Sequence, residues 1–114
     1  EILDMINNYR AENGLGPLTW STDLQSSAYI RANECVASFS HTRPDGSEWW
    51  TSGNPYAENI ACGSGGNANF QVLFDSWVNS DGHRANMLNP DYHTIGCSAV
   101  SADGVLYAVQ HFGY

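Results

Sequence analysis

The end of the chain contains the feature that most restricts its fold. Residues 93–101 (HTIGCSAVS) and 105–113 (VLYAVQHFG) both have the composition of β-strands, and Ala-Asp-Gly separates them. An Asp-Gly pair between two strand-like runs is typical of a tight hairpin turn. The sequence therefore predicts an antiparallel β-hairpin over residues 93–113.

Helical patterns come before this hairpin. In residues 1–13, apolar side chains at positions 2, 3, 5, 6 and 9 form one face of a helix, which Gly14 and the following Gly-Pro pair end. A second helix is expected over residues 22–36, begun by Ser21 or by Thr22, the latter with Gln25 in a capping box.

The middle of the chain adds one strand and two further helices. Residues 57–62 form a short strand-like run, residues 68–79 predict a helix with an aromatic face, and residues 83–88 predict a short helical turn. Residues 37–56 are irregular and contain a Pro-Asp-Gly turn. Helices followed by a hairpin favour an α+β fold, in which helices cover an antiparallel sheet. At 114 residues, we expect one domain over residues 1–114.

The charge of the chain limits its partners. The net charge is −8, and all four cationic side chains are arginines. Such a surface repels nucleic acid and anionic membranes, so we expect neither as a partner. No apolar run reaches the ~18 residues of a transmembrane helix. The oligomeric state leaves no trace in the sequence.

Three polar side chains stand in stretches that we expect to meet in one cleft. His41 lies in FSHTRPDGS (39–47), Glu58 in the apolar run AENIA (57–61) and His83 in the run 79–96. A carboxylate in an apolar run is costly unless it is paired, so we expect partners for Glu58, with the two imidazole rings on opposite sides of it. The alternative is an edge-strand glutamate that points to water.

A His/Glu/His set supports several kinds of chemistry. His41 and His83 could hold Zn²⁺ with water completing the shell, Glu58 could act as a general base, or the three could form a buried polar network. A Ser80–His83–Glu58 triad has the right residue types but no nucleophile elbow. Cys97, inside a strand pattern, is better explained as a buried inert thiol than as a nucleophile.

The other candidate residues are assigned structural roles. We expect the two remaining histidines to be ordinary sheet residues, two arginines to tie down loops and two asparagines to satisfy backbone groups near the cleft: His93, His111, Arg43, Arg84, Asn59 and Asn86. The adjacent pair Trp49-Trp50 is either packed or an exposed site for another protein. An odd count of three cysteines permits one disulfide plus a thiol, or three reduced thiols.

The blocks of this chain, taken in order, resemble the CAP superfamily (cysteine-rich secretory proteins, antigen 5 and plant pathogenesis-related group 1), also called the SCP domain, and most of all its short bacterial branch. The similarity covers the whole chain and is carried by INNYRAENGLGPLTW, SHTRPDGS, AENIA, WVNSDGHRANML, HTIGCS and QHFG.

This resemblance implies a three-layer α–β–α sandwich with a central antiparallel sheet, in a secreted or cell-surface protein. It also implies a cleft with two histidines and two acidic residues, where His41, Glu58 and His83 match three positions. The fourth acidic position is Ser80 here, with Asp81 beside it. This departure weakens a metal site and any mechanism that needs two acids. We further expect Cys35 and Cys62 to pair and Cys97 to remain a free thiol.

Members of the superfamily differ in function, so the fold does not select one. We favour a secreted binding module whose cleft takes a small ligand, a metal ion or a partner peptide. The alternative is a hydrolase of peptide or cell-wall material, with Glu58 as general base and His41 and His83 as metal ligands or electrophiles. A third hypothesis is an interaction domain that docks through Trp49-Trp50.

Overall fold

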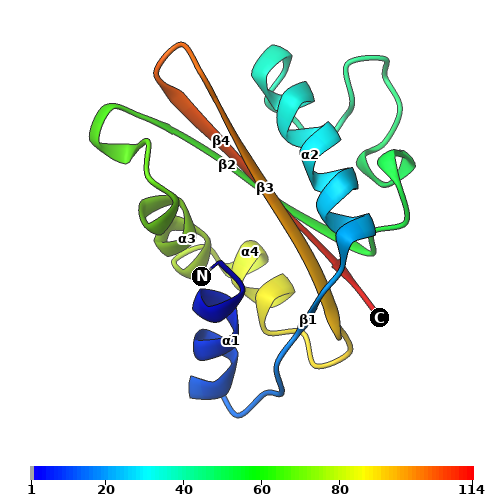
Figure 1. Cartoon of the computed structure of the whole chain (residues 1–114), viewed down its shortest axis with the longest axis vertical. Helices are drawn as coiled ribbons and strands as arrows, with labels where there is room; N and C mark the ends of the chain where they lie inside the picture. Colours follow the sequence, from blue (N-terminus) through cyan, green and yellow to red (C-terminus); the bar gives the residue numbers. More distant parts are fainter. Residues whose placement is uncertain (1) are drawn as a thin grey trace.

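The computed structural model describes residues 2–114 and builds them into helices and one sheet (Figure 1). Residue 1, predicted to begin the first helix, lies outside the described residues. The α-helices are α1 (Ile2–Glu12), α2 (Thr22–Ala37), α3 (Phe70–Val78) and α4 (Asp81–Met87). The strands are β1 (Thr19–Trp20), β2 (Ala57–Ser64), β3 (Thr94–Ala102) and β4 (Val105–Gly113), with short 3-10 turns η1 (Trp49–Ser52) and η2 (Gly65–Asn67).

The sheet has the strand order β1-β3-β4-β2, so β2 lies at one edge. The predicted hairpin is confirmed: β3 and β4 pair antiparallel, and their turn holds Asp103 and Gly104 at φ 51° and 78°. Two positive φ values are what a type I′ turn requires, which explains the Asp-Gly pair. β2 pairs antiparallel with β4, whereas the two-residue β1 runs parallel to β3 and makes the sheet mixed.

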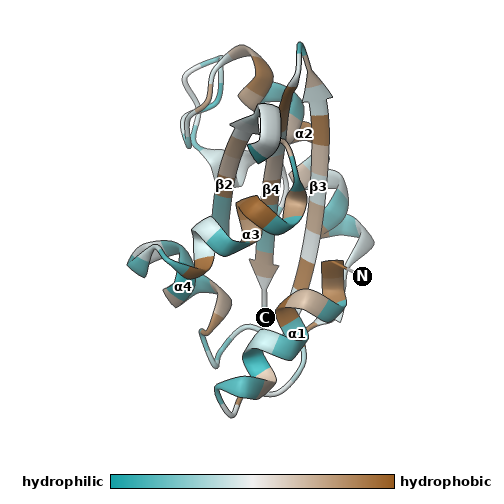
Figure 2. Cartoon of the chain, turned by 90° about the vertical axis from the view of Figure 1, so that its left-hand side faces the viewer, coloured by the Kyte–Doolittle hydropathy of each residue, from teal (hydrophilic) through white to brown (hydrophobic). Residues whose placement is uncertain are grey.

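Helices cover both faces of the sheet, as the predicted three-layer α–β–α sandwich requires. Figure 1 shows α2 on one side of the strands and α1, α3 and α4 on the other. Figure 2 views the second side, where α1, α3 and α4 lie in front of the strands. The two faces have separate hydrophobic clusters, one under α2 and one under the other three helices.

Small residues bring α2 close to the sheet. Ala28, Ala32 and Cys35 of α2 are buried against Ile60 and Val109. Gly96 of β3 permits the closest approach, because a Cβ added there would lie 2.0 Å from the backbone nitrogen of Gln25. Any side chain at position 96 would therefore push α2 away from the sheet.

The opposite face has the larger side chains and a buried arginine. Trp77 and Met87 are fully buried there, together with Ile6 of α1. The buried guanidinium of Arg10 donates hydrogen bonds to the backbone carbonyls of Gly16, Met87, Asn89 and Tyr92. It thereby joins α1 to the end of α4 and to the segment that leads into β3.

Alternation along β2 places consecutive side chains on opposite faces. Glu58 and Ile60 face α2, whereas Asn59 faces α3 and α4 between Ala57 and Ala61 of the larger cluster. Glu58 and Asn59 both lie opposite a polar residue of β4: Glu58 pairs with His111, and Asn59 pairs with Gln110. These two cross-strand pairs form the basis of the candidate site.

Caps explain where the helices differ from their predicted bounds. Ser21 caps α2 by accepting a hydrogen bond from the Leu24 amide, and Gln25 instead accepts from the indole of Trp20, so the predicted Thr22–Gln25 capping box is wrong. Asn69 caps α3 through its side-chain oxygen. Ser80 occupies the N-cap position of α4 without a side-chain capping bond, and α4 starts at Asp81 rather than at residue 83.

The expected Cys35–Cys62 disulfide is wrong, because all three cysteines are free. Cys35 is sealed between α2 and the sheet, whereas Cys62 lies exposed near the end of β2, so the two thiols occupy different environments. Cys97 is a buried thiol, as predicted, and burial raises its pKa to about 12. Among residues 2–114, no helix is both long and apolar enough to span a bilayer.

Candidate functional site

Glu58 lies at the centre of a buried hydrogen-bond network. Its side chain is fully buried and accepts hydrogen bonds at both carboxylate oxygens. Arg31 donates from Nε to Oε2 (3.0 Å) and from Nη2 to Oε1 (3.3 Å). The ring of His41 lies 2.9 Å from Oε1 through Nδ1, and that of His111 lies 2.7 Å from Oε2 through Nε2. Glu58 is therefore paired, and the alternative of an edge glutamate in water is wrong.

These partners keep the carboxylate ionised. Burial alone raises the pKa of Glu58, but the hydrogen bonds from His111, His41 and Arg31 outweigh it and lower the pKa to about 2. A carboxylate with so low a pKa binds a proton weakly and is a poor general base. Its geometry and its pKa both indicate a structural anchor for the groups around it.

The network extends outward along α2 to the irregular loop. Arg31 also donates to Glu34 (2.9 Å), and Glu34 in turn accepts three hydrogen bonds from Arg43 in the loop. Arg31 further donates to the backbone carbonyl of Ser40, next to His41. Arg43 thus ties down its loop, as predicted, and the network holds the segment that carries His41.

His111 continues the network inward to Ser27 of α2. Its Nδ1 lies 2.7 Å from the Ser27 hydroxyl, which also lies 3.0 Å from the carbonyl of Leu24. Because a hydroxyl has one proton, Ser27 donates either to Leu24 or to His111. In the first case Nδ1 of His111 must be the donor and the ring is doubly protonated; in the second it is neutral. In both cases Nε2–H faces Glu58.

His41 presents the accessible edge of this network. Its side chain is 50% exposed, although Nδ1 is fixed by the buried carboxylate. An ionised carboxylate only accepts, so Nδ1 of His41 is the donor and the neutral ring has its lone pair on Nε2. Nε2 makes no hydrogen bond with any residue in the described part of the chain, so it can accept a proton or bind a metal ion.

His83 comes from α4 and is oriented by a different group. Its Nδ1 lies 2.7 Å from the hydroxyl of Ser80, and it makes no hydrogen bond with Glu58 or His41. Partial burial lowers its pKa, and the nearby charge of His41 lowers it further. The second imidazole bonded to Glu58 is thus His111, whereas His83 interacts with His41 only through space.

Neutral amides hold α4 against β2. Asn59 donates to the backbone carbonyl of His83 (3.1 Å) and to Oε1 of Gln110 (3.1 Å), and Asn86 donates to Oδ1 of Asn59 (2.9 Å). Asn59 therefore satisfies a backbone group, as predicted, whereas Asn86 bonds the side chain of Asn59 instead of a backbone group. Among the described residues, Nε2 of Gln110 is buried without a hydrogen-bond partner.

Position 80, the fourth position of the expected cleft of two histidines and two acids, has no carboxylate bonded to it in the described part of the chain. Ser80 replaces the acid that the family pattern has there, and Asp81 does not substitute for it. The Asp81 side chain is 96% exposed and pairs with Arg84, which also donates to the carbonyl of Val78. A Ser80–His83 pair therefore exists, but no acid among residues 2–114 orients the imidazole as a hydrolytic triad requires.

The remaining predicted residues lie outside this arrangement or at its border. His93 is exposed just before β3. Trp49 is partly buried with its ring centroid 6.3 Å from that of His111, and Trp50, packed edge-on against Trp49, is 49% exposed. Trp49 is thus packed, and only Trp50 of the pair remains available to another protein.

Two central residues of the network, Arg31 and His111, were not among the predicted site residues. His111 was assigned as an ordinary sheet residue, which is wrong, because its pairing with Glu58 depends on the register of β2 and β4. The position of Arg31 gave a usable signal: it lies between Ala28 and Ala32 on the apolar face of the predicted helix. A charged residue on such a face implies a buried partner of opposite charge.

The donor set fits only an open metal site. His41, with Nδ1–H bonded to a carboxylate, has the geometry of a metal-binding histidine with a supporting second shell. The lowered pKa of His83 favours the neutral ring, which is the form that binds a metal ion. Within residues 2–114, however, no group of three or more His, Cys, Asp or Glu side chains is arranged to hold a metal ion. Water would have to complete the coordination shell.

Comparisons with known proteins agree on one family. The model of the CAP family, the cysteine-rich secretory protein family, matches residues 3–112. The uncharacterized protein YkwD of Bacillus subtilis (strain 168) is 28% identical over 99% of this chain, which spans 46% of that protein. The chain therefore covers about half the length of this relative.

Solved structures share the fold at low identity. An outer surface protein of Borrelia burgdorferi is 20% identical with a TM-score of 0.79, over 98% of this chain and 88% of that one. An extracellular protein of Bacillus anthracis str. Ames containing an SCP domain is 20% identical with a TM-score of 0.74, over 96% and 38%. A structure of NaASP2 with Zn²⁺ is 17% identical with a TM-score of 0.77, over 97% and 76%. With its family match, its layers and its strand order, the chain belongs to the CAP family.

Proposed function

We propose that residues 1–114 act as one extracellular CAP domain that binds a divalent metal ion, such as Zn²⁺, between His41 and His83 at the edge of β2. The carrying observation is the His41 ring, which the buried carboxylate of Glu58 fixes while half of the side chain remains exposed. A fixed ring loses little freedom on binding, so Nε2 is ready to accept a metal ion or a polar ligand.

Two further observations support metal binding. The lowered pKa of His83 leaves a second neutral imidazole close enough for the charge of His41 to act on it. One structural neighbour, NaASP2, has been crystallised with Zn²⁺. Two imidazoles with water in the remaining positions form an open site, so we expect weak, exchangeable binding.

The hydrolase alternative has less support. Both oxygens of Glu58 are occupied by hydrogen bonds, and its side chain has no exposed surface. To act as a general base it would have to break the bonds that keep it ionised. The ligand-facing groups are the two imidazoles and the Ser80 hydroxyl, and no described carboxylate orients the Ser80–His83 pair.

The proposed location outside the cell is supported by the neighbours. The Bacillus anthracis protein is extracellular and the Borrelia burgdorferi protein is an outer surface protein. In such a place, binding a metal ion would not compete with cytosolic buffers.

The test is calorimetric titration of Zn²⁺ into the wild type and into His41→Ala and His83→Ala. Each variant should lower the affinity at least about tenfold, because each removes one of two protein ligands. His93→Ala is the matched control, since His93 is an exposed histidine outside the site, and it should leave the affinity unchanged. Equal heats in all four proteins would reject the proposed metal site.

A further inference from the structure

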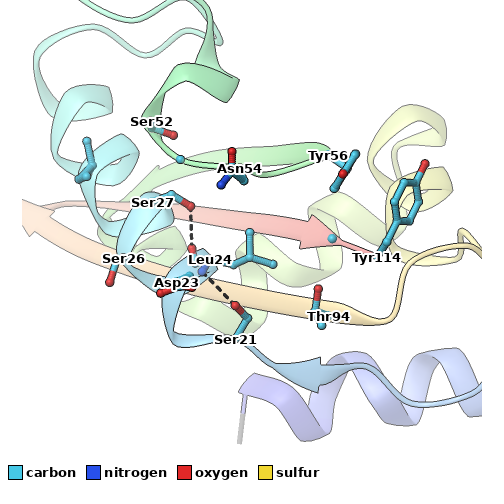
Figure 3. Close-up of a pocket in the computed structure, with 13 residues that line it drawn as sticks. Ser21, Asp23, Leu24, Ser26, Ser27, Ser52, Asn54, Tyr56, Thr94 and Tyr114 are labelled. Atoms are coloured by element: carbon cyan, nitrogen blue, oxygen red, sulfur yellow. Dashed lines mark hydrogen bonds between the residues drawn. The ribbon is translucent and has the colours of Figure 1, made fainter.

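A pocket lies on the α2 side of the sheet, and neither His41 nor His83 lines it. It has a volume of about 490 Å³, within the usual range for small-molecule sites, and we call it the α2 pocket. Its walls are the first turns of α2, residues 52–56 and the end of β4 with Tyr114. Figure 3 shows Asn54 and Tyr56 on one side of the hollow, with Ser27 and Leu24 of α2 on the other.

The polar groups of this pocket are available to a ligand. Among the described residues, no partner accepts from or donates to the side chains of Asp23, Ser26, Asn54 or Thr94, all of which line the pocket. By contrast, the Ser21 hydroxyl is engaged in the helix cap. The free set combines one carboxylate, two hydroxyls and one amide, so it offers both donors and acceptors.

Two tyrosines form an aromatic wall at the open side. The rings of Tyr56 and Tyr114 lie with their centroids 4.2 Å apart, although the residues are 58% and 64% exposed. Tyr114 also contacts Tyr92, which stacks on the buried ring of Phe112. The exposed pair therefore belongs to a row of rings that begins in the core, which limits its movement.

Glycine keeps the pocket open. A Cβ added at Gly113 would lie 2.7 Å from Oγ1 of Thr94 and 3.3 Å from Cδ1 of Leu24. A Cβ at Gly53 would lie 2.8 Å from Cβ of Ser27. Side chains at these two positions would force the walls apart or fill the space between them, so the hollow depends on both residues.

The charge of the lining excludes several ligand classes. The described lining residues include Asp23 but no lysine, arginine or histidine. In a chain of net charge −8, this disfavours phosphate, anionic lipid and other anions. The apolar part of the lining comes from Leu24, Ile30 and the rings of Tyr56 and Tyr114, and it stands beside free polar groups, which favours a ligand with one apolar face over a purely hydrophobic one.

From this chemistry we propose that the α2 pocket binds a neutral pyranose unit of a glycan. A sugar ring has hydroxyls around its edge, which the free carboxylate, hydroxyls and amide can bind. It also has a C–H face, which packs against an aromatic ring such as Tyr56 or Tyr114. Neutral saccharides match both the polarity of the pocket and its lack of cationic groups.

The test is NMR titration of the ¹⁵N-labelled protein with three trisaccharides at millimolar concentration: chitotriose, cellotriose and mannotriose. At least one should give saturable shifts centred on the amides of Ser26, Asn54 and Tyr114. Tyr56→Ala should weaken that binding by up to about tenfold, because it removes the stacking surface. Asn54→Ala should also weaken it, which keeps the test valid if the tyrosine variant is unstable.

Phe39→Ala is the control, since Phe39 is an exposed aromatic residue outside the pocket lining, and it should leave the binding unchanged. Inorganic phosphate should produce no shifts at the pocket. The proposal is overturned if none of the three sugars shifts the pocket amides, if phosphate shifts them, or if Tyr56→Ala and Asn54→Ala bind like the wild type.

Discussion

Glu58 and Asn59 are neighbours in β2, yet they support the two faces of the sheet by different means. Glu58 points to α2 and holds a charged network of Arg31, His111 and His41. Asn59 points to α4 and holds a neutral network of amides and one carbonyl. Each face supports one histidine of the candidate site: His41 through its own ring, and His83 through its backbone.

This difference determines how tightly each histidine is fixed. A buried carboxylate is costly to desolvate, so it is stable only while every partner is present, and it holds those partners in one arrangement. Amide hydrogen bonds contribute less each and tolerate more change. We therefore expect the ring of His41 to be positioned more rigidly than that of His83, whose one side-chain partner in the described part of the chain is the Ser80 hydroxyl.

The strongest test of the charged face is Glu58→Gln. The substitution leaves the buried guanidinium of Arg31 without its main counter-charge, which should cost about 3–5 kcal/mol of unfolding free energy. Urea unfolding followed by tryptophan fluorescence measures the loss. Asp91→Asn, at an exposed aspartate beyond α4, is the control. If the loss of unfolding free energy for Glu58→Gln is no larger than that of the control, the charged network around Glu58 does not stabilise the fold.

Acidic pH should reduce the stability that the network around Glu58 contributes. The folded-state pKa of Glu58 is about 2, below its ordinary value of 4.5, so its stabilising effect is complete above the unfolded-state pKa and is lost as the pH falls toward 2. The loss from this one group should be about 3 kcal/mol. Urea unfolding at a series of pH values measures it, and Glu58→Gln should remove this part of the pH dependence. A wild type and variant with parallel pH profiles would contradict the expectation.

Local signals were sufficient to predict most of the fold. The Asp-Gly turn fixed the hairpin, and the spacing of Phe70, Leu73, Phe74 and Trp77 fixed the buried face of α3. The parallel pairing of β1 with β3 was not predictable, because a two-residue strand leaves no periodic pattern. The starts of α3 and α4 differ by two residues from the predicted ones, because capping residues such as Asn69 and Ser80 also fitted a loop.

The site was harder to predict, because it depends on contacts between distant segments. A paired Glu58 followed from its apolar surroundings, but its partners did not: the order of β2 and β4 brings in His111, and the packing of α2 brings in Arg31. The Cys35–Cys62 disulfide was inferred from positions along the chain, which do not determine which side chains meet. Sequence thus indicated which residue needed partners, and only the fold could supply them.

The neutral face should be less sensitive to substitution. Asn59→Ala removes the hydrogen bonds to the His83 carbonyl, Gln110 and Asn86, and should cost about 1–3 kcal/mol, less than Glu58→Gln. Hydrogen exchange should increase in α4 more than in α2, since α4 loses its tether. Asn33→Ala, which removes an exposed side-chain hydrogen bond within α2, is the control. An equal rise in exchange across both helices would contradict the separation of the two faces.

A carboxylate at position 80 should make the two histidines more alike. Ser80→Asp places an acceptor beside Nδ1 of His83, as Glu58 does for His41, and should tighten Zn²⁺ binding by about tenfold. Ser80→Ala should weaken it. Calorimetric titration measures both, with unchanged urea midpoints as evidence that the fold is intact. If Ser80→Asp binds Zn²⁺ no better than the wild type, the orientation of His83 does not limit the site.

The smallest effect is expected for Asp81→Asn. This variant tests whether a carboxylate must contact His83 directly or need only lie near it. Its side chain is 96% exposed and pairs with Arg84, and ion pairs in water contribute little. Asp81→Asn should therefore leave both the urea midpoint and the Zn²⁺ affinity unchanged within error. Asp81 is adjacent to Ser80 and carries the same charge that Ser80→Asp would add, but its side chain lies in solvent and contacts Arg84 instead of His83. If Ser80→Asp tightens Zn²⁺ binding and Asp81→Asn does not change it, direct contact with Nδ1, rather than nearby negative charge, positions His83. If Asp81→Asn weakens Zn²⁺ binding, Asp81 itself has the role of the missing acid.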